Sequence, residues 1–113
     1  MDKILEKTLL YDFYGELLTE RQRQVYESVV FNDLSLGEAA ACYGISRQGI
    51  HDMIRRCDEA LSGYERKLGF VEKSLRTAKD AARIKELVSQ YRATEDQALL
   101  AQAEELAAGL EQL

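Results

Sequence analysis

The sequence contains no proline, the residue that most strongly ends or kinks a helix. It is instead rich in leucine, alanine, glutamate, arginine, lysine and glutamine, all of which favour helices. Together these features predict an all-α fold. At 113 residues the chain is long enough for one domain with a real core and an appended segment.

Cysteines are few and long apolar segments are absent. Cys42 and Cys57 fall at apolar positions of predicted helices and lack the CxxC spacing of a metal or redox site, so we expect two small core residues. The longest uncharged runs fall far short of the roughly 20 apolar residues of a membrane span. No segment resembles a signal peptide. We therefore expect a cytoplasmic protein without a membrane span.

Side chains suited to catalysis are also scarce. The single histidine, His51, has only Asp52 beside it, and neighbouring residues of a helix do not face each other. It therefore lacks the partners that a general base or a metal ligand needs. There is no glycine-rich phosphate loop and no nucleophile–base arrangement. The sequence predicts a protein that is not an enzyme and holds no metal or cofactor.

Positive charge is in excess in none of the three segments 1–18, 19–68 and 69–113. The net charge is −5, and residues 19–68 carry seven basic and eight acidic side chains. A nucleic-acid binder normally shows a basic surface. Any binding of DNA or RNA would therefore depend on a local patch.

Residues 36–53, LGEAAACYGISRQGIHDM, have the pattern of a helix-turn-helix. Gly44 stands where a short turn needs positive φ, and Ser46 stands where the next helix needs an N-cap. Small or apolar residues fall at the positions that two steeply crossing short helices bury. These are Ala39, Ala40, Tyr43, Ile45, Ile50 and Met53.

Two earlier helix starts in the sequence are also specified by their capping residues. Thr19 with Gln22, and Ser35 with Glu38, have the spacing of a capping box. Between these helices, residues 32–33 (Asn-Asp) have the chemistry of a loop. The core candidates of the helix that begins at Thr19 are Val25, Val29 and Val30.

An amphipathic helix is predicted before Thr19 and ends near Gly15. Its apolar face passes through Ile4 or Leu5, then Leu9 and Phe13, and is widened by Leu10 and Tyr14.

Beyond the turn, apolar residues recur at alternating spacings of four and three. They are Ile50, Ile54, Cys57, Leu61, Tyr64 and Leu68, continued in phase by Val71, Leu75, Ala78 and Ala82. This heptad-like row indicates a long second helix. Gly69 predicts a break, because glycine in a helix interior costs about 1 kcal/mol relative to alanine. We expect a helix-turn-helix domain over residues 1–68, and a C-terminal helical segment over 69–113 that begins with a helix from about Phe70 to Tyr91.

A last helix is predicted to begin at Thr94, with Gln97 completing the cap. Its apolar residues form one narrow stripe of Leu99, Ala103, Leu106 and Leu110. Such a stripe suits a partner helix, either from the same chain or from a second copy. Because homodimers are the commonest oligomers of soluble proteins, we expect the segment to serve in packing or dimerisation.

Residues that could contact nucleic acid lie early in the helix after Ser46. Arginine pairs with guanine, glutamine pairs with adenine, and either Arg or Lys neutralises phosphates. The exposed face would present Arg47, Gln48, His51, Asp52 and Arg55. The alternative is that the arginines are solvated surface charges. Asp52 argues against the groove, because its carboxylate would face phosphates.

Residues 18–61, LTERQRQVYESVVFNDLSLGEAAACYGISRQGIHDMIRRCDEAL, resemble the fourth region of bacterial sigma factors, including the LTxRQ opening and the GIS turn. The whole chain, with its opening LEKTLLYDFYGELLTERQ and the later YERKLGF, more closely resembles the YlxM family of small bacterial proteins. This second resemblance covers roughly the first 70 residues well and the remainder loosely.

The YlxM resemblance implies a helix-turn-helix fold without a wing, and a non-catalytic regulatory protein. It also implies a part in the signal recognition particle pathway, with the particle's components or their GTPases as partners. The sigma-factor resemblance implies that DNA would be contacted by Ser46, Arg47, Gln48, His51 and Arg55. Two hypotheses follow: a regulator that binds protein or ribonucleoprotein, and a DNA-binding regulator. RNA binding would bridge the two.

Overall fold

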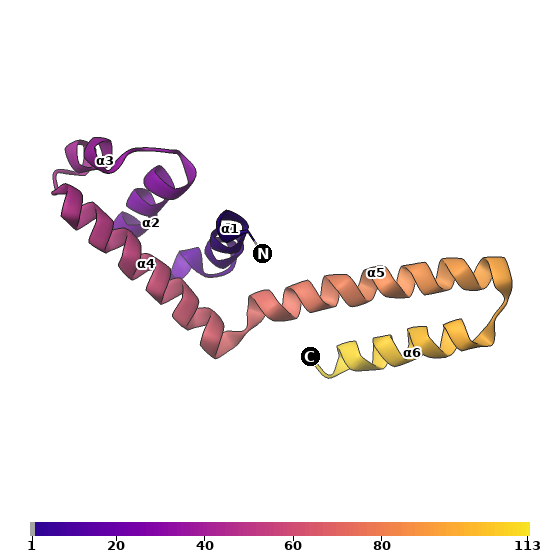
Figure 1. The fold of residues 1–113 in the computed structure, drawn as a ribbon. Helices are drawn as coiled ribbons and strands as arrows, with labels where there is room; N and C mark the ends of the chain where they lie inside the picture. The colour runs from indigo at the N-terminus through magenta and orange to yellow at the C-terminus, as the bar shows by residue number, and fades with distance from the viewer. Residues whose placement is uncertain (1) are drawn as a thin grey trace. The chain divides into compact units, whose positions relative to one another are not determined.

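The computed structural model describes residues 2–113, which form two compact units that adjoin in sequence at Gly69 and Phe70. All regular structure in this range is helical, so the all-α prediction is confirmed (Figure 1). The first unit holds α1 (Lys3–Tyr14), α2 (Glu20–Tyr26), α3 (Leu36–Tyr43) and α4 (Arg47–Leu68). The second unit holds α5 (Phe70–Thr94) and α6 (Gln97–Glu111).

Capping residues define the starts of α2 and α3, as predicted. Thr19 and Gln22 form a complete capping box, in which the Thr19 amide donates to Gln22 Oε1 at 2.9 Å. Ser35 and Glu38 form the second box. The Ser35 amide donates to the Glu38 carboxylate, and this bond holds the pKa of Glu38 below its ordinary value. Each box satisfies amides that the first helical turn leaves without partners.

A π-helical turn, Glu27–Phe31, continues from α2 and ends at Asn32. The chain then changes direction at Asp33, whose φ of 59° is left-handed. Asn and Asp tolerate this conformation better than most residues. The predicted loop at residues 32–33 is therefore confirmed, and it leads directly to the Ser35 cap.

The core of the helix-turn-helix is centred on Val25, Ala39 and Ile50, which are fully buried. Partly buried side chains surround this centre: Val29, Leu34, Ala40, Tyr43, Ile45, Met53 and Ile54. These include the small and apolar positions predicted from residues 36–53. Val30 is only half-buried, whereas Tyr26, which was not a predicted core residue, is completely buried.

Tyrosines of α1 and α2 join these helices to α4 and to each other. Their hydroxyls donate to carboxylates, Tyr14 to Glu65 at 2.6 Å and Tyr26 to Asp58 at 2.5 Å. Burial and the adjacent Asp58 carboxylate raise the pKa of Tyr26. The Tyr11 and Tyr26 rings stack with centroids 5.5 Å apart. Each tyrosine thus combines apolar burial with a satisfied hydroxyl.

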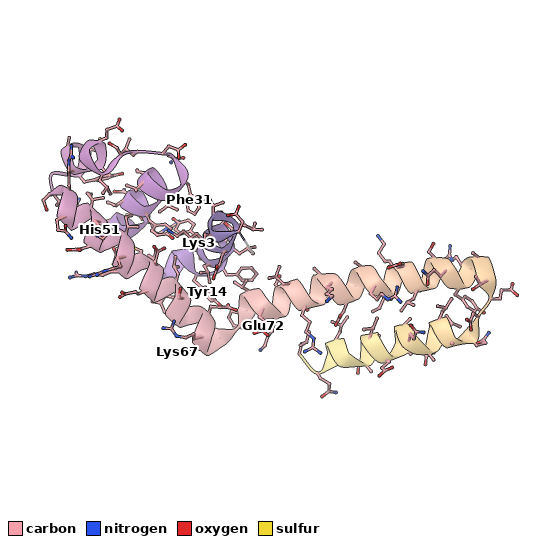
Figure 2. The ribbon with its side chains drawn as sticks, in the orientation of Figure 1. Lys3, Tyr14, Phe31, His51, Lys67 and Glu72 are labelled. Atoms are coloured by element: carbon pink, nitrogen blue, oxygen red, sulfur yellow. The ribbon has the colours of Figure 1, made fainter. Side chains whose placement is uncertain are left out.

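The predicted inner face of α1 is only partly confirmed. The buried side chains are Leu10 and Tyr14, which the prediction places at the margin of the apolar face, and α1 packs against α4. Tyr14, whose hydroxyl donates to Glu65 of α4, lies between the two helices (Figure 2). Ile4, Leu5 and Phe13 are exposed. Both sides of this helix carry apolar residues, so periodicity alone could not identify the inner one.

Cys42 is also misassigned, because it is exposed, whereas Cys57 is buried as predicted. The core face of α3 is defined by Ala39, Ala40 and Tyr43. Cys42 does not belong to this face and is open to solvent.

The heptad-like row is buried through the middle of α4 but not beyond Val71. Ile50, Cys57 and Leu61 are buried, whereas Leu68, the last residue of α4, is exposed. Helix α4 ends before Gly69, which has a φ of 64°, so the helix break predicted there is confirmed. In α5 Val71 is buried, but Leu75, Ala78 and Ala82 are exposed. The reason is that α6 packs on a different face of α5.

The side of α5 that packs against α6 contains Leu87, which is buried, with Ile84 and Tyr91 half-buried. The α6 stripe of Leu99, Ala103, Leu106 and Leu110 is buried or half-buried. The two helices pack against each other. The stripe therefore finds its partner within the same chain, which removes the reason for expecting a dimer through α6.

The start of α6 differs from the prediction. Thr94 is the last residue of α5, and its hydroxyl donates to the Gln90 carbonyl at 3.0 Å. The N-cap is Asp96, which accepts from the Ala98 amide at 3.0 Å. Glu95, with a φ of 58°, reverses the chain between the two helices. A threonine followed by glutamine three residues later was therefore an accidental match to the capping-box pattern.

Candidate nucleic-acid interface

The turn between α3 and α4 sets the position of the candidate interface. Gly44 has a φ of 68°, and its amide donates to the Ala40 carbonyl at 3.0 Å, as does the Ile45 amide at 3.2 Å. Ser46 then caps α4, its hydroxyl accepting from the Gly49 amide at 3.0 Å. These bonds satisfy the end of α3 and the start of α4. The helix-turn-helix predicted from residues 36–53 is thus formed.

Four of the five candidate residues lie in the N-terminal part of α4, and Ser46 is its N-cap. Ser46, Arg47, Gln48, His51 and Arg55 are each exposed. Arg47, His51 and Arg55 follow one another at intervals of four residues, which places them along one side of the helix. The His51 side chain is 58% exposed (Figure 2). The structure therefore brings the predicted residues together on a surface that is open to a partner.

Asp52 is tied to its neighbours within α4. Its Oδ1 accepts from Gln48 Nε2 at 2.9 Å and lies 3.8 Å from His51 Nδ1. The carboxylate therefore orients the Gln48 amide instead of standing as an isolated negative charge. The Gln48 Oε1 atom is left to accept a hydrogen bond from a partner. Asp52 still adds a negative charge to the face.

Arg47 extends back over α3. A Cβ atom placed on Gly37 would lie 2.7 Å from Arg47 Nη2 and 3.1 Å from its Cζ. The guanidinium group thus rests against the backbone of Gly37, in space that a side chain at position 37 would share. This contact gives Arg47 a preferred orientation while leaving it exposed.

A further cation, Arg21, was not among the predicted site residues. Its Nη2 donates to the Tyr43 carbonyl at 2.7 Å, and its guanidinium lies 5.9 Å from the centre of the Tyr43 ring. Arg21 belongs to α2 but is exposed beside the turn into α4. No local pattern links residues 21 and 43, so only the fold could reveal this proximity. Arg56 is likewise exposed on α4 and follows directly after Arg55.

The start of α4 presents polar groups to a partner. Across residues 2–113 there is no group of three or more His, Cys, Asp or Glu side chains that could hold a metal ion. Within that same range, no helix is long and apolar enough to cross a membrane. The exposed helix end instead offers amide, imidazole and guanidinium donors, which hydrogen-bond to phosphates and base edges.

Comparison with known families agrees with this architecture. Residues 1–101 match the family described as "Putative helix-turn-helix protein, YlxM / p13 like". The chain belongs to this family. The resemblance to YlxM proteins is therefore confirmed, and it extends well beyond the first 70 residues. Helix-turn-helix families of this kind support a regulatory or nucleic-acid-binding role and are not typically enzymatic.

Individual relatives support the same assignment. A UPF0122 protein of Caldanaerobacter subterraneus subsp. tengcongensis is 47% identical over 87 residues, which is 77% of this chain and 74% of the relative. One of Thermoanaerobacter sp. is 41% identical over 113 residues, covering 99% and 97% of the two chains. One of Acetivibrio thermocellus is 48% identical over 84 residues, or 74% and 72%. This chain therefore spans nearly the whole length of one of these relatives.

Proposed function

We propose that this chain is a non-catalytic regulator that binds duplex DNA through the first turns of α4. The observation that carries the proposal is the shared exposed face of Arg47, Gln48, His51 and Arg55 at the start of a capped second helix. The second helix of a helix-turn-helix typically enters the major groove with its N-terminal residues at the bases. Ser46, at the N-cap, would lie nearest the phosphates.

Duplex DNA suits this face better than duplex RNA does. The major groove of B-DNA admits an α-helix, whereas that of A-form RNA is too narrow for side chains to read. Arg55 would pair with guanine or neutralise a phosphate, and Gln48 would present its carbonyl oxygen to an amino group on a base edge. Arg21, beside the turn, would add a phosphate contact.

The experiment compares two double variants that lose the same charge. Arg47→Ala with Arg55→Ala changes the proposed face, and Lys79→Ala with Arg92→Ala removes two exposed cations of α5. Binding to a pool of random-sequence duplex DNA is followed by fluorescence anisotropy over a series of salt concentrations. We expect the first variant to bind at least about tenfold more weakly and to reduce the salt slope by about two.

Two results would overturn DNA binding through α4. One is wild-type protein that retains no DNA at low salt. The other is an equal loss in both double variants, which would indicate a general charge effect. Circular dichroism of each variant controls for folding, because Arg47 also rests against Gly37.

A second candidate function is regulation of the signal recognition particle or its GTPases, which membership of the YlxM family implies. The negative charge of Asp52 within the face and the net charge of −5 favour a protein partner over nucleic acid. Pull-down with the particle's purified protein and with its RNA tests this candidate separately. A complex with the protein that survives the Arg47→Ala and Arg55→Ala changes would support it, and no complex with either component would exclude it. Both candidate partners lie in the cytoplasm, where we expect the chain to act.

A further inference from the structure

The outer side of α1 carries an apolar row that no helix of the first unit covers. Leu5, Leu9 and Phe13 follow one another at intervals of four residues, so they lie along one side of the helix. Leu5 is 49% exposed and Phe13 is 43% exposed, and Leu9 is half-buried. In the 3-10 turn after α1, Leu17 is 57% exposed. We call Leu5, Leu9, Phe13 and Leu17 the α1 row.

Folding of the first unit does not explain the α1 row. Leu10 and Tyr14 are the α1 side chains that are buried, and α1 packs against α4. Helix α1 therefore carries one apolar face for its own core and a second one toward the outside. Leu5, Leu9 and Phe13 on one side of α1, followed by the exposed Leu17 in the next turn, form the kind of apolar surface that proteins use for interaction.

Acidic side chains accompany the row. Asp2, Glu6, Asp12 and Glu16 are all exposed. Residues four apart are slightly offset around a helix, so Leu5 and Phe13 mark the two edges of the row. Glu6 lies two turns before Phe13, at one edge, and Asp12 lies two turns after Leu5, at the other. In the described part of the chain none of the four forms an ion pair.

The lysines of α1 do not neutralise this surface. Lys7 is directed to α4, where its Nζ lies 3.4 Å from Asp58 Oδ2. Lys3, the other lysine of α1, supplies one positive charge beside four carboxylates. An apolar row between carboxylates is complementary to a helix with an apolar stripe and basic flanks.

We propose that the α1 row is a docking surface for a basic amphipathic helix of another protein. The same charges disfavour the other partners. A second copy would bring the same carboxylates face to face, and nucleic acid or an anionic membrane would meet negative charge. This surface is distinct from the proposed DNA-binding face on α4 and does not depend on it. The chain would thus carry two sites of opposite chemistry.

The test uses fluorescently labelled synthetic helical peptides and the full-length chain. The probe is a leucine–lysine peptide with leucines at amphipathic helical spacing. The two control peptides are a leucine–glutamate peptide of the same pattern and a scrambled leucine–lysine peptide. Anisotropy titration should show binding of the probe that is at least about tenfold tighter than binding of either control.

Two pairs of matched variants separate docking from simple charge attraction. Leu5→Ser with Phe13→Ser should weaken the probe's binding at least about tenfold without changing the net charge. The control, Leu75→Ser with Val88→Ser, changes an exposed leucine and an exposed valine of α5 and should leave the probe's binding unchanged. Glu6→Gln with Glu16→Gln should weaken binding more than Glu104→Gln with Glu111→Gln, which changes exposed carboxylates of α6.

Several outcomes would overturn the proposal. Equal binding of the leucine–glutamate peptide would show that the carboxylates do not select the partner. Equal loss in a variant pair and its control would place the binding elsewhere. A doubled mass in light scattering that Phe13→Ser abolishes would show that a second copy covers the row. All of these variants alter exposed side chains, so circular dichroism should show unchanged helix content.

Discussion

Gly44 and Gly69 end helices in the left-handed region of backbone space, with φ of 68° and 64°. A side chain at such a position costs about 1 kcal/mol or more, because its Cβ approaches the following carbonyl oxygen. Nothing lies within 4 Å of a Cβ built on either residue. Backbone conformation alone, and not crowding, therefore favours glycine at these two positions.

Gly44→Ala should destabilise the chain by about 1 kcal/mol in urea unfolding followed by circular dichroism. Gly109→Ala is the matched control, since Gly109 lies inside α6 and also has open space around its Cβ position. That change should stabilise by up to about 1 kcal/mol, because alanine favours helix. Shifts of the same sign for both variants would contradict a conformational role for Gly44.

The two thiols should differ sharply in reactivity. Cys42 is exposed and Cys57 is fully buried, and burial raises the pKa of the Cys57 thiol to about 11. Because the thiolate is the reactive form, a thiol-specific chromogenic reagent at neutral pH should label one cysteine of the folded chain promptly. The second should react only in denaturant. Prompt labelling of two thiols in the wild-type chain, or of one thiol in Cys42→Ser, would contradict this assignment.

At the scale of helices, packing decides which of several apolar faces is buried. In α5 the face that meets α6 contains Leu87, which is 1% exposed, whereas Leu75 on another face is 42% exposed. Both leucines lie in one continuous helix of similar composition along its length. Because Leu87 packs against the neighbouring helix and Leu75 does not, the two leucines contribute differently to the free energy of unfolding.

Leu87→Ala should therefore cost about 2–5 kcal/mol, the usual range for removing a buried leucine side chain. Leu75→Ala should change stability by less than about 0.5 kcal/mol. Hydrogen exchange of the α6 amides is the most direct measurement, because local opening of the α5–α6 pair would accelerate it. Similar protection of α6 in both variants would contradict the packing of α6 on the Leu87 face.

Features set within one turn of helix could be predicted from the sequence. The capping boxes at Thr19 and Ser35, the N-cap at Ser46 and the break at Gly69 each depend on residues within four positions. They fixed the phase of the helix-turn-helix, and thus the surface on which the candidate residues lie.

Features that depend on a distant neighbour could not be predicted in this way. The outer position of Phe13 depends on α4 covering the opposite side of α1. Arg21 reaches the turn only because α2 and α3 are folded together. Thr94 matches the capping pattern in the sequence, but the residue that caps the N-terminus of α6 is Asp96. A local sequence pattern identifies residues that could cap a helix, and the tertiary structure determines which of them does so.

At the scale of the whole molecule, the covering of the α6 stripe within the chain bears on oligomeric state. The stripe packs on α5, and the exposed α1 row is accompanied by carboxylates that would repel a second copy. We expect light scattering to give a mass near 12.8 kDa at micromolar concentration. Twice that mass, unchanged by Phe13→Ser, would indicate a dimer through another surface.

The contact of Arg47 with Gly37 has a consequence for how this sequence can vary. The atoms that a Cβ at position 37 would meet all belong to the end of the long, exposed Arg47 side chain. A side chain at position 37 would therefore displace the guanidinium and leave the backbone of α3 in place. Substitution of Gly37 would thus act on the orientation of a candidate DNA contact and not on the packing of the helix-turn-helix.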